Sequence, residues 1–162
     1  MILQFEGMKW MEKLISTDHN FSIDFKKLNL PVMIVLSIIT LGAYIGVWFL
    51  RNRQSIQNSH YKTGIHFGLW RVFTLGSFIF LFIHFFGNLV LSDYGLANIE
   101  SYEIIFNFFF IGFLYYSIFR LRESFEEEAD VILNKYLLFF LHVFYIQYKM
   151  NQLQDSQTNV KG

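Results

Sequence analysis

The residue of this chain with the clearest potential for chemistry is His84, which lies within the long uncharged stretch 72–91. Histidine exchanges a proton readily near neutral pH, so an imidazole inside an apolar segment could relay protons. The interiors of the apolar stretches contain no Asp or Glu to act as its partner, and Glu103 lies at the interfacial end of one stretch. We therefore favour a neutral imidazole that is hydrogen-bonded inside a helix pair. The missing carboxylates also argue against a proton-coupled or sodium-coupled transporter.

Other patterns that would indicate catalysis or metal binding are weak. The chain has no cysteine, which excludes disulfides, thiolate metal sites and cysteine catalysis. His60 and His66 could be combined with glutamates into a metal site, but their spacing is not that of compact metal ligands. No nucleophile elbow, phosphate loop or pair of catalytic carboxylates is present. We expect no cofactor and no enzymatic activity, and a formal net charge of zero argues against nucleic acid as a partner.

The elements that must position these residues are four apolar stretches, at 30–50, 72–91, 103–119 and 136–148. Only 16% of the residues are charged, compared with about 25% in an average soluble domain. At about 1.5 Å per helical residue, the first two stretches are long enough to cross a hydrocarbon core of about 30 Å. The third approaches that length only when Tyr102 and Glu103, which extend it into the membrane interface, are included. The fourth is too short to span unaided. The expected fold is a single all-α integral membrane domain, residues 1–162.

Three further segments flank the apolar stretches. Residues 1–29 carry an apolar stripe opposite charged residues, which predicts an amphipathic helix at the membrane interface. An acidic amphipathic helix is expected at 120–135, and a flexible polar tail at 149–162. Trp48 and Trp70 lie close to the expected interfaces, where tryptophan is enriched in membrane proteins.

The distribution of basic residues predicts the topology. The connector 92–101 contains no Lys or Arg, whereas 51–71 and 120–135 both do, so 92–101 is expected outside and the other two in the cytoplasm. If all four stretches span, the basic residues are split almost evenly between the two sides. If 30–50 and 136–148 only dip into the membrane or lie along it, all 13 are inside. Charge therefore favours a central two-helix hairpin flanked by two partial segments, and four full spans are the alternative.

Two glycines in the first stretch decide whether it can turn back. Gly42 and Gly46 could break the helix and so allow a re-entrant segment. The same Gly-x-x-x-Gly spacing could instead let a second helix approach closely. Both interpretations remain open from the sequence.

The two central stretches contain polar residues that are expected to face protein. Counted inward from the connector, Asn88 and Asn107 fall at one level, and Ser77 and Ser117 fall at another. Hydrogen bonds between such groups contribute only about 0.6 to 2 kcal/mol each, so they would set the register of a hairpin more than its stability. The predicted helix-packing residues are Gly42, Gly46, Ser77, His84, Asn88, Asn107 and Ser117.

The acidic segment offers a candidate interaction surface in the cytoplasm. Glu126, Glu127 and Glu128 lie on one face of the expected helix, opposite its apolar residues. We expect them to meet the basic connector, which includes Arg51 and Arg53, or a partner protein. A face that is simply solvated is the alternative, because exposed ion pairs contribute little stability.

Several short blocks resemble a group of small, largely uncharacterised bacterial membrane proteins, a domain-of-unknown-function group. The blocks are 21–27, then Thr-Leu-Gly-Ala-Tyr at 40–44, Trp-Phe-Leu-Arg-Asn at 48–52, and Gly-Leu-Trp-Arg-Val-Phe at 68–73. They correspond to the group's Thr-x-Gly-x-Tyr turn, its Trp-Phe pair with a basic, Asn-containing end, and a Trp-Arg opening of the second span. The usual proline before that Trp-Arg is absent here. The resemblance covers about residues 21–85 and implies a helical fold and a bacterial inner-membrane location, but no reaction.

The sequence therefore predicts a multi-pass membrane protein that is not an enzyme and acts as a structural, regulatory or sensing component. The lipid bilayer is its expected surrounding, and a second copy of the chain or another membrane protein is the candidate partner. The alternative is a small channel or transporter subunit, in which an oligomer gathers His84, Asn88 and Asn107 around a pore.

Overall fold

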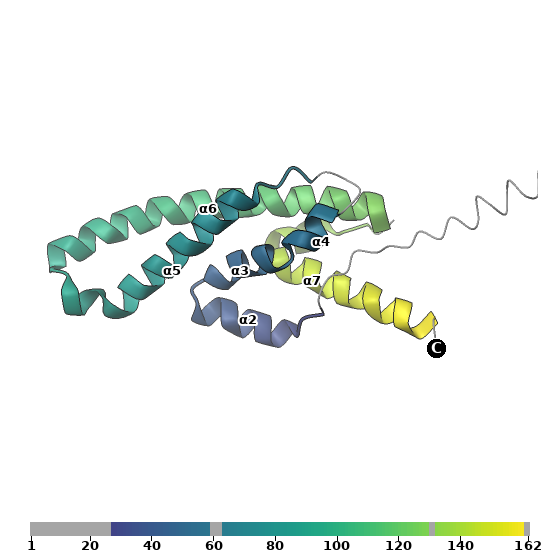
Figure 1. The fold of residues 1–162 in the computed structure, drawn as a ribbon, viewed down its shortest axis with the longest axis horizontal. Helices are drawn as coiled ribbons and strands as arrows, with labels where there is room; N and C mark the ends of the chain where they lie inside the picture. Colours follow the sequence, from purple (N-terminus) through teal and green to yellow (C-terminus); the bar gives the residue numbers. More distant parts are fainter. Residues whose placement is uncertain (1–26, 59–62, 130–131, 161–162) are drawn as a thin grey trace, which may run out of the picture.

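The computed structural model describes residues 27–58, 63–129 and 132–160, and no strand occurs among them. The expected amphipathic helix at 1–29 lies almost entirely outside the described residues. Figure 1 shows a long helical hairpin that projects from a cluster of shorter helices. In chain order the helices are α2 (Leu30–Ile39), α3 (Ala43–Arg51), α4 (Arg53–Asn58), α5 (Phe67–Val90), α6 (Asp93–Ala129) and α7 (Lys135–Val160).

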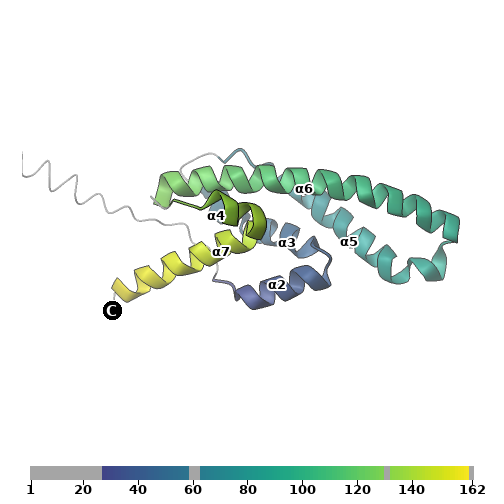
Figure 2. The same ribbon diagram turned by 180° about the vertical axis from the view of Figure 1, so that it is seen from behind.

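The hairpin consists of α5 and α6, and both views of the fold show it extending beyond the other helices (Figures 1 and 2). By length and composition, both helices are long and apolar enough to cross a membrane. Glycines allow them to approach closely, because a Cβ at Gly76 would lie 2.6 Å from Phe106 and one at Gly87 would lie 2.9 Å from Leu96. The all-helical architecture and the central hairpin agree with the sequence prediction.

The expected loop at 92–101 is mostly helical. Helix α6 begins at Asp93, and it continues without interruption through the predicted stretch 103–119 to Ala129. No proline interrupts this region, and the chain's one proline is Pro31 at the start of α2. The acidic helix predicted at 120–135 is therefore the end of α6, which stops at Ala129, and a separate helix, α7, begins at Lys135.

The first apolar stretch is not one helix. Helices α2 and α3 run antiparallel, joined by a sharp turn in which Leu41 and Gly42 have φ of 48° and 89°. The turn satisfies its own backbone, since Gly42 N donates to Ser37 O at 2.7 Å and Tyr44 N donates to the Thr40 hydroxyl at 3.0 Å. Gly42 thus provides the break, because glycine adopts positive φ without steric cost.

The fourth stretch is also broken. Within α7, His142 has φ 46° and ψ −124°, so the helix reverses direction sharply at this residue. Its Nε2 lies 2.8 Å from the hydroxyl of Tyr115 on α6, and that hydroxyl is 3.3 Å from Phe139 O. Neither 30–50 nor 136–148 is a continuous helix, and among the described residues only α5 and α6 are long and apolar enough to cross a membrane. The tail predicted as flexible at 149–162 is helical as far as Val160.

The core lies where α3 packs on α5. The rings of Phe49 and Trp70 stack with centroids 3.9 Å apart, and Trp48 meets Phe49 edge-on at 5.1 Å. Both tryptophans are fully buried rather than placed at an interface with lipid, which corrects the expectation from their position in the sequence. Gly46 permits this packing, because a Cβ there would overlap the Thr74 hydroxyl. The two glycines therefore divide the two predicted roles, with the break at Gly42 and the close contact at Gly46.

Replacing Gly46 with alanine should destabilise the protein, because the added methyl group would force α3 away from Thr74. Overpacking of this kind costs about 1–3 kcal/mol. Gly112→Ala is the matched control, since nothing lies within 4 Å of a Cβ at that position of α6. Thermal unfolding of the purified variants would measure the difference, and equal midpoints for the two variants would contradict the close contact.

Candidate functional site

A chain of buried and partly buried hydrogen bonds connects the Trp-Phe segment to α7. The indole Nε1 of Trp48 donates to Gln147 Oε1 at 2.8 Å, and Gln147 Nε2 donates to Asn151 Oδ1 at 2.8 Å. Asn151 Nδ2 in turn donates to the carbonyl of Leu28 at 2.8 Å. Gln147 is 0% exposed. These partners satisfy polar groups that would otherwise be costly to bury, so the chain is a structural link.

A second buried link joins the two helices of the hairpin. Trp70 Nε1 donates to the Ser117 hydroxyl at 3.2 Å, and the hydroxyl of Thr74 donates to Trp70 O at 2.6 Å. Ser117 therefore contacts α5, but its partner there is Trp70 and not Ser77, the residue predicted to lie at its level. The Ser77 hydroxyl instead donates to Phe73 O in its own helix at 2.9 Å.

The register of the hairpin differs from the predicted one. Phe106 packs against Gly76 and Leu96 against Gly87, so Asn107 lies level with the middle of α5, whereas Asn88 lies near its end. The two amides are not at one level. The prediction assumed a loop at 92–101, and the early start of α6 at Asp93 moves Asn107 further from the turn.

His84, Asn88 and Asn107 are exposed in the structure, which corrects the expectation that they pack inside the hairpin. The physical reason is that the helix cluster ends before it reaches them. His84 and Asn88 continue, at helical spacing, the face of α5 that α3 covers near Thr74. Asn107 continues the face of α6 that carries the buried Leu114. Each of these three residues thus lies on a helix face beyond the point where other helices cover that face.

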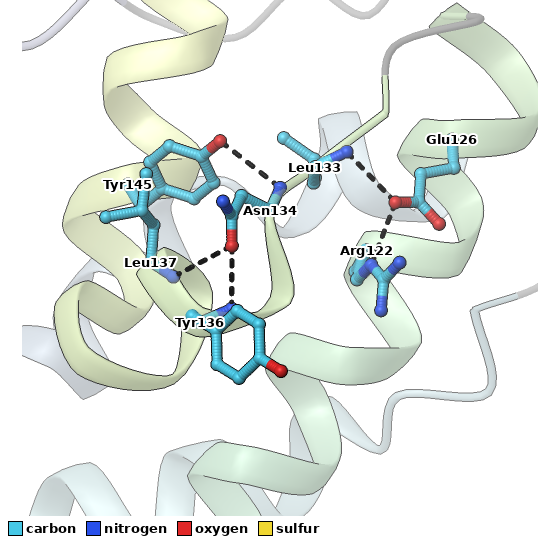
Figure 3. A network of polar contacts seen from close by, with 7 residues as sticks. All are labelled: Arg122, Glu126, Leu133, Asn134, Tyr136, Leu137 and Tyr145. Atoms are coloured by element: carbon cyan, nitrogen blue, oxygen red, sulfur yellow. Dashed lines mark hydrogen bonds and ion pairs between the residues drawn. The ribbon is translucent and has the colours of Figure 1, made fainter.

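The acidic end of α6 holds the turn into α7 (Figure 3). Glu126 accepts hydrogen bonds from Arg122 Nε at 2.8 Å and from the backbone N of Leu133 at 3.0 Å. Asn134 then caps α7, because its Oδ1 accepts from the N–H of Tyr136 at 2.9 Å, and the Asn134 N–H donates to the Tyr145 hydroxyl at 3.3 Å. The described partners of Glu126 are therefore within its own helix and the turn, not in the basic connector.

The other glutamates of this face fall into three situations. Glu123 pairs with Arg120 on the same helix at 2.7 Å, and Glu127 is exposed. The side chain of Glu128 lies outside the described residues. Arg120 of α6 does reach the connector, because its Nε donates to Thr63 O at 3.2 Å. Sequence reasoning missed this contact, since its acceptor is a backbone carbonyl.

The basic connector forms an open cavity at the start of α5. The cavity has a volume of about 680 Å³ and is lined by Arg53, Gln57, Ile65, His66, Phe67, Gly68, Leu69 and Arg71. Arg53 Nε donates to Gln57 Oε1 at 3.0 Å, and its guanidinium carbon lies 6.0 Å from the centre of the Phe67 ring. Arg51, the other predicted interaction residue of this segment, is exposed and does not line the cavity. The sequence indicated Arg53 but not that Arg71 lines the same cavity, because the two residues belong to different helices.

No group of three or more His, Asp or Glu side chains that could hold a metal ion occurs among the described residues. Comparison of the chain with protein-family models, with curated proteins and with solved structures finds no match. The resemblance to the bacterial membrane group therefore stays a prediction. Its characteristic residues nevertheless have clear structural positions here, with Gly42 in the helix break and both tryptophans in the core.

Glu126→Ala should loosen the turn between α6 and α7, because the Leu133 N–H would lose its acceptor and Arg122 its ion partner. For this partly exposed group we expect a loss of about 1 kcal/mol. Glu127→Ala is the control, since that side chain is exposed on the same helix. Thermal unfolding would compare the two, and an effect at Glu127 as large as that at Glu126 would contradict the structural role of Glu126.

Proposed function

We propose that this chain is a multi-pass protein of the bacterial inner membrane, in which α5 and α6 cross the bilayer. The observation that carries the proposal is the exposure of large apolar side chains along the projecting hairpin. Leu89 and Phe108, for example, are 81% and 78% exposed. Such surface is unfavourable in water, and patches of this extent mark contact with a membrane or another protein.

The position of the first broken helix supports partial insertion. Gly46 lies beside Thr74 and Phe49 stacks on Trp70, so α3 runs antiparallel to α5. If the alignment of α3 with α5 is extended toward the start of α3, the turn at Leu41 and Gly42 lies level with about the midpoint of α5. The segment would therefore enter about half of the hydrocarbon core and return to the same side, with its backbone groups satisfied inside the turn.

The second broken helix supports an interfacial position for α7. The break at His142 contacts Tyr115, which is close in sequence to Ser117, the partner of Trp70 near the start of α5. This level corresponds to one end of the hairpin rather than its middle. In the proposed topology 92–101 is outside, 51–71 and 120–135 are cytoplasmic, and all 13 basic residues are on the cytoplasmic side.

We further propose a structural, regulatory or sensing role without enzymatic activity, with the bilayer and a second copy or another membrane protein as partners. The alternative is a channel or transporter subunit. It is supported by the exposure of His84, Asn88 and Asn107 on helices that are otherwise apolar. Polar groups in the membrane interior are costly against lipid, so they favour contact with protein or water in an oligomer.

Single cysteines can test the topology, because the native chain contains none. We expect a membrane-impermeant maleimide to label Ser92→Cys in intact cells, whereas Gln54→Cys and Ser156→Cys should react only after permeabilisation. Leu41→Cys should remain unlabelled in both conditions, because the turn would lie in the hydrocarbon. Labelling of Ser156→Cys in intact cells would contradict an interfacial α7, and labelling of Leu41→Cys would contradict partial insertion.

The channel alternative makes a separate prediction about His84. Liposomes that contain the protein should show a pH-dependent ion flux, and His84→Phe should abolish its pH dependence while the protein still assembles. Flux through sealed vesicles with an ion-sensitive dye would measure this, and Phe85→Leu is the control on the neighbouring exposed position. No flux from the unmodified chain would exclude the alternative and leave the scaffold role.

A further inference from the structure

The cavity at the start of α5 has a charge pattern that suits an anion. Two guanidinium groups, from Arg53 and Arg71, line it, and the lining includes no carboxylate. The sequence contains no Asp or Glu from Arg51 to Ser92, so no neighbouring acid along the chain offsets this charge. The ion pairs recorded among the described residues involve Lys27, Arg120 and Arg122, not the two arginines of the cavity.

The guanidinium of Arg53 is held in place by neighbouring side chains, and most of its N–H donors remain available. Gln57 accepts the hydrogen bond from its Nε, and the ring of Phe67 lies near its guanidinium carbon. A guanidinium has five N–H donors, so four remain on the two terminal nitrogens. Planar arrays of this kind bind phosphate oxygens in pairs, with charge-assisted hydrogen bonds that are stronger than neutral ones. Gln57 and His66 add further polar groups to the lining.

The cavity also adjoins apolar surface. Leu69, in its lining, and Val72, just beyond Arg71, are exposed on the first turns of α5. In the proposed topology these turns lie where the helix enters the bilayer, at the level of the lipid headgroups. A ligand with a phosphate group and an attached acyl chain would therefore meet the arginines and the apolar side chains together.

We infer that this cavity binds the phosphate group of an anionic lipid headgroup. The inference rests on the proposed membrane location, because the lipid would reach the cavity from the cytoplasmic leaflet. The same donors would also bind the oxygens of inorganic phosphate, so the two sources of this chemistry must be compared directly.

The test uses the full chain, purified in a neutral detergent, and three probes: short-chain phosphatidylglycerol, short-chain phosphatidylcholine and inorganic phosphate. Phosphatidylcholine carries the same phosphate but also a choline cation, which the two arginines would repel. We therefore expect phosphatidylglycerol to bind at least about ten-fold more tightly than phosphatidylcholine, as measured by native mass spectrometry. Arg53→Gln and Arg71→Gln should each weaken that binding by about ten-fold. Arg51→Gln is the matched control, because it removes the same charge from the same segment without lining the cavity.

The outcomes separate the cavity from the membrane proposal. Equal binding of the two lipids, or equal loss in Arg51→Gln and Arg71→Gln, would overturn the inference. Binding of inorganic phosphate as tight as that of phosphatidylglycerol would overturn the lipid as the source. Thermal unfolding checks that each variant is folded, and Arg71→Gln, whose side chain is exposed, carries the test if Arg53→Gln is unstable. Failure of the membrane location itself would be seen in the cysteine labelling, which does not depend on these arginines.

Discussion

The close approach of α3 to α5 is the contact on which most of the structure depends. Without a side chain at Gly46, the backbone of α3 can lie against Thr74, and this brings Phe49 into a stack with Trp70. Trp70 can then donate its indole hydrogen to Ser117, and this hydrogen bond fixes the first part of α5 against α6. Trp48, on the neighbouring position of α3, extends the same arrangement to α7 through Gln147. One small residue thus allows four helices to meet.

The two helix breaks show how the fold compensates for interrupted hydrogen bonding. An unpaired backbone group is costly wherever water is excluded, whether in a protein core or in a bilayer. At the first break the Thr40 hydroxyl donates to Leu36 O at 2.7 Å and accepts from the Tyr44 N–H, so the polar groups of the turn are satisfied locally. At the second break, Tyr115 of α6 supplies a hydroxyl to the region of His142. The first break is self-contained, whereas the second depends on a neighbouring helix.

Among the described residues, the ion pairs at the acidic end of α6 do not include the arginines of the connector. Two arginines of α6 form ion pairs with glutamates one turn further along the same helix. Such pairs contribute modest stability, and neither of them involves Arg53 or Arg71. Of the glutamates expected to meet the connector, Glu126 is therefore engaged with its own helix and the turn to α7, whereas Glu127 is exposed.

The sequence by itself determined the helical class and the approximate position of α5, because a long apolar run without charges favours a helix of membrane-spanning length. It did not determine the bounds of α6, which begins within the expected loop at 92–101 and continues to Ala129, and the equally long apolar run 30–50 forms two helices rather than one. The run 72–91 corresponds closely to α5, and the glycine pair at Gly42 and Gly46 identified the region of the break. Only the tertiary structure decided the register of the hairpin, the assignment of separate roles to the two glycines and the reversal at His142. These features arise from contacts between residues far apart in the chain, such as Gly46 with Thr74 and Tyr115 with His142. Periodicity along a sequence records which face of a helix is apolar, but not which neighbour covers it or where that cover ends.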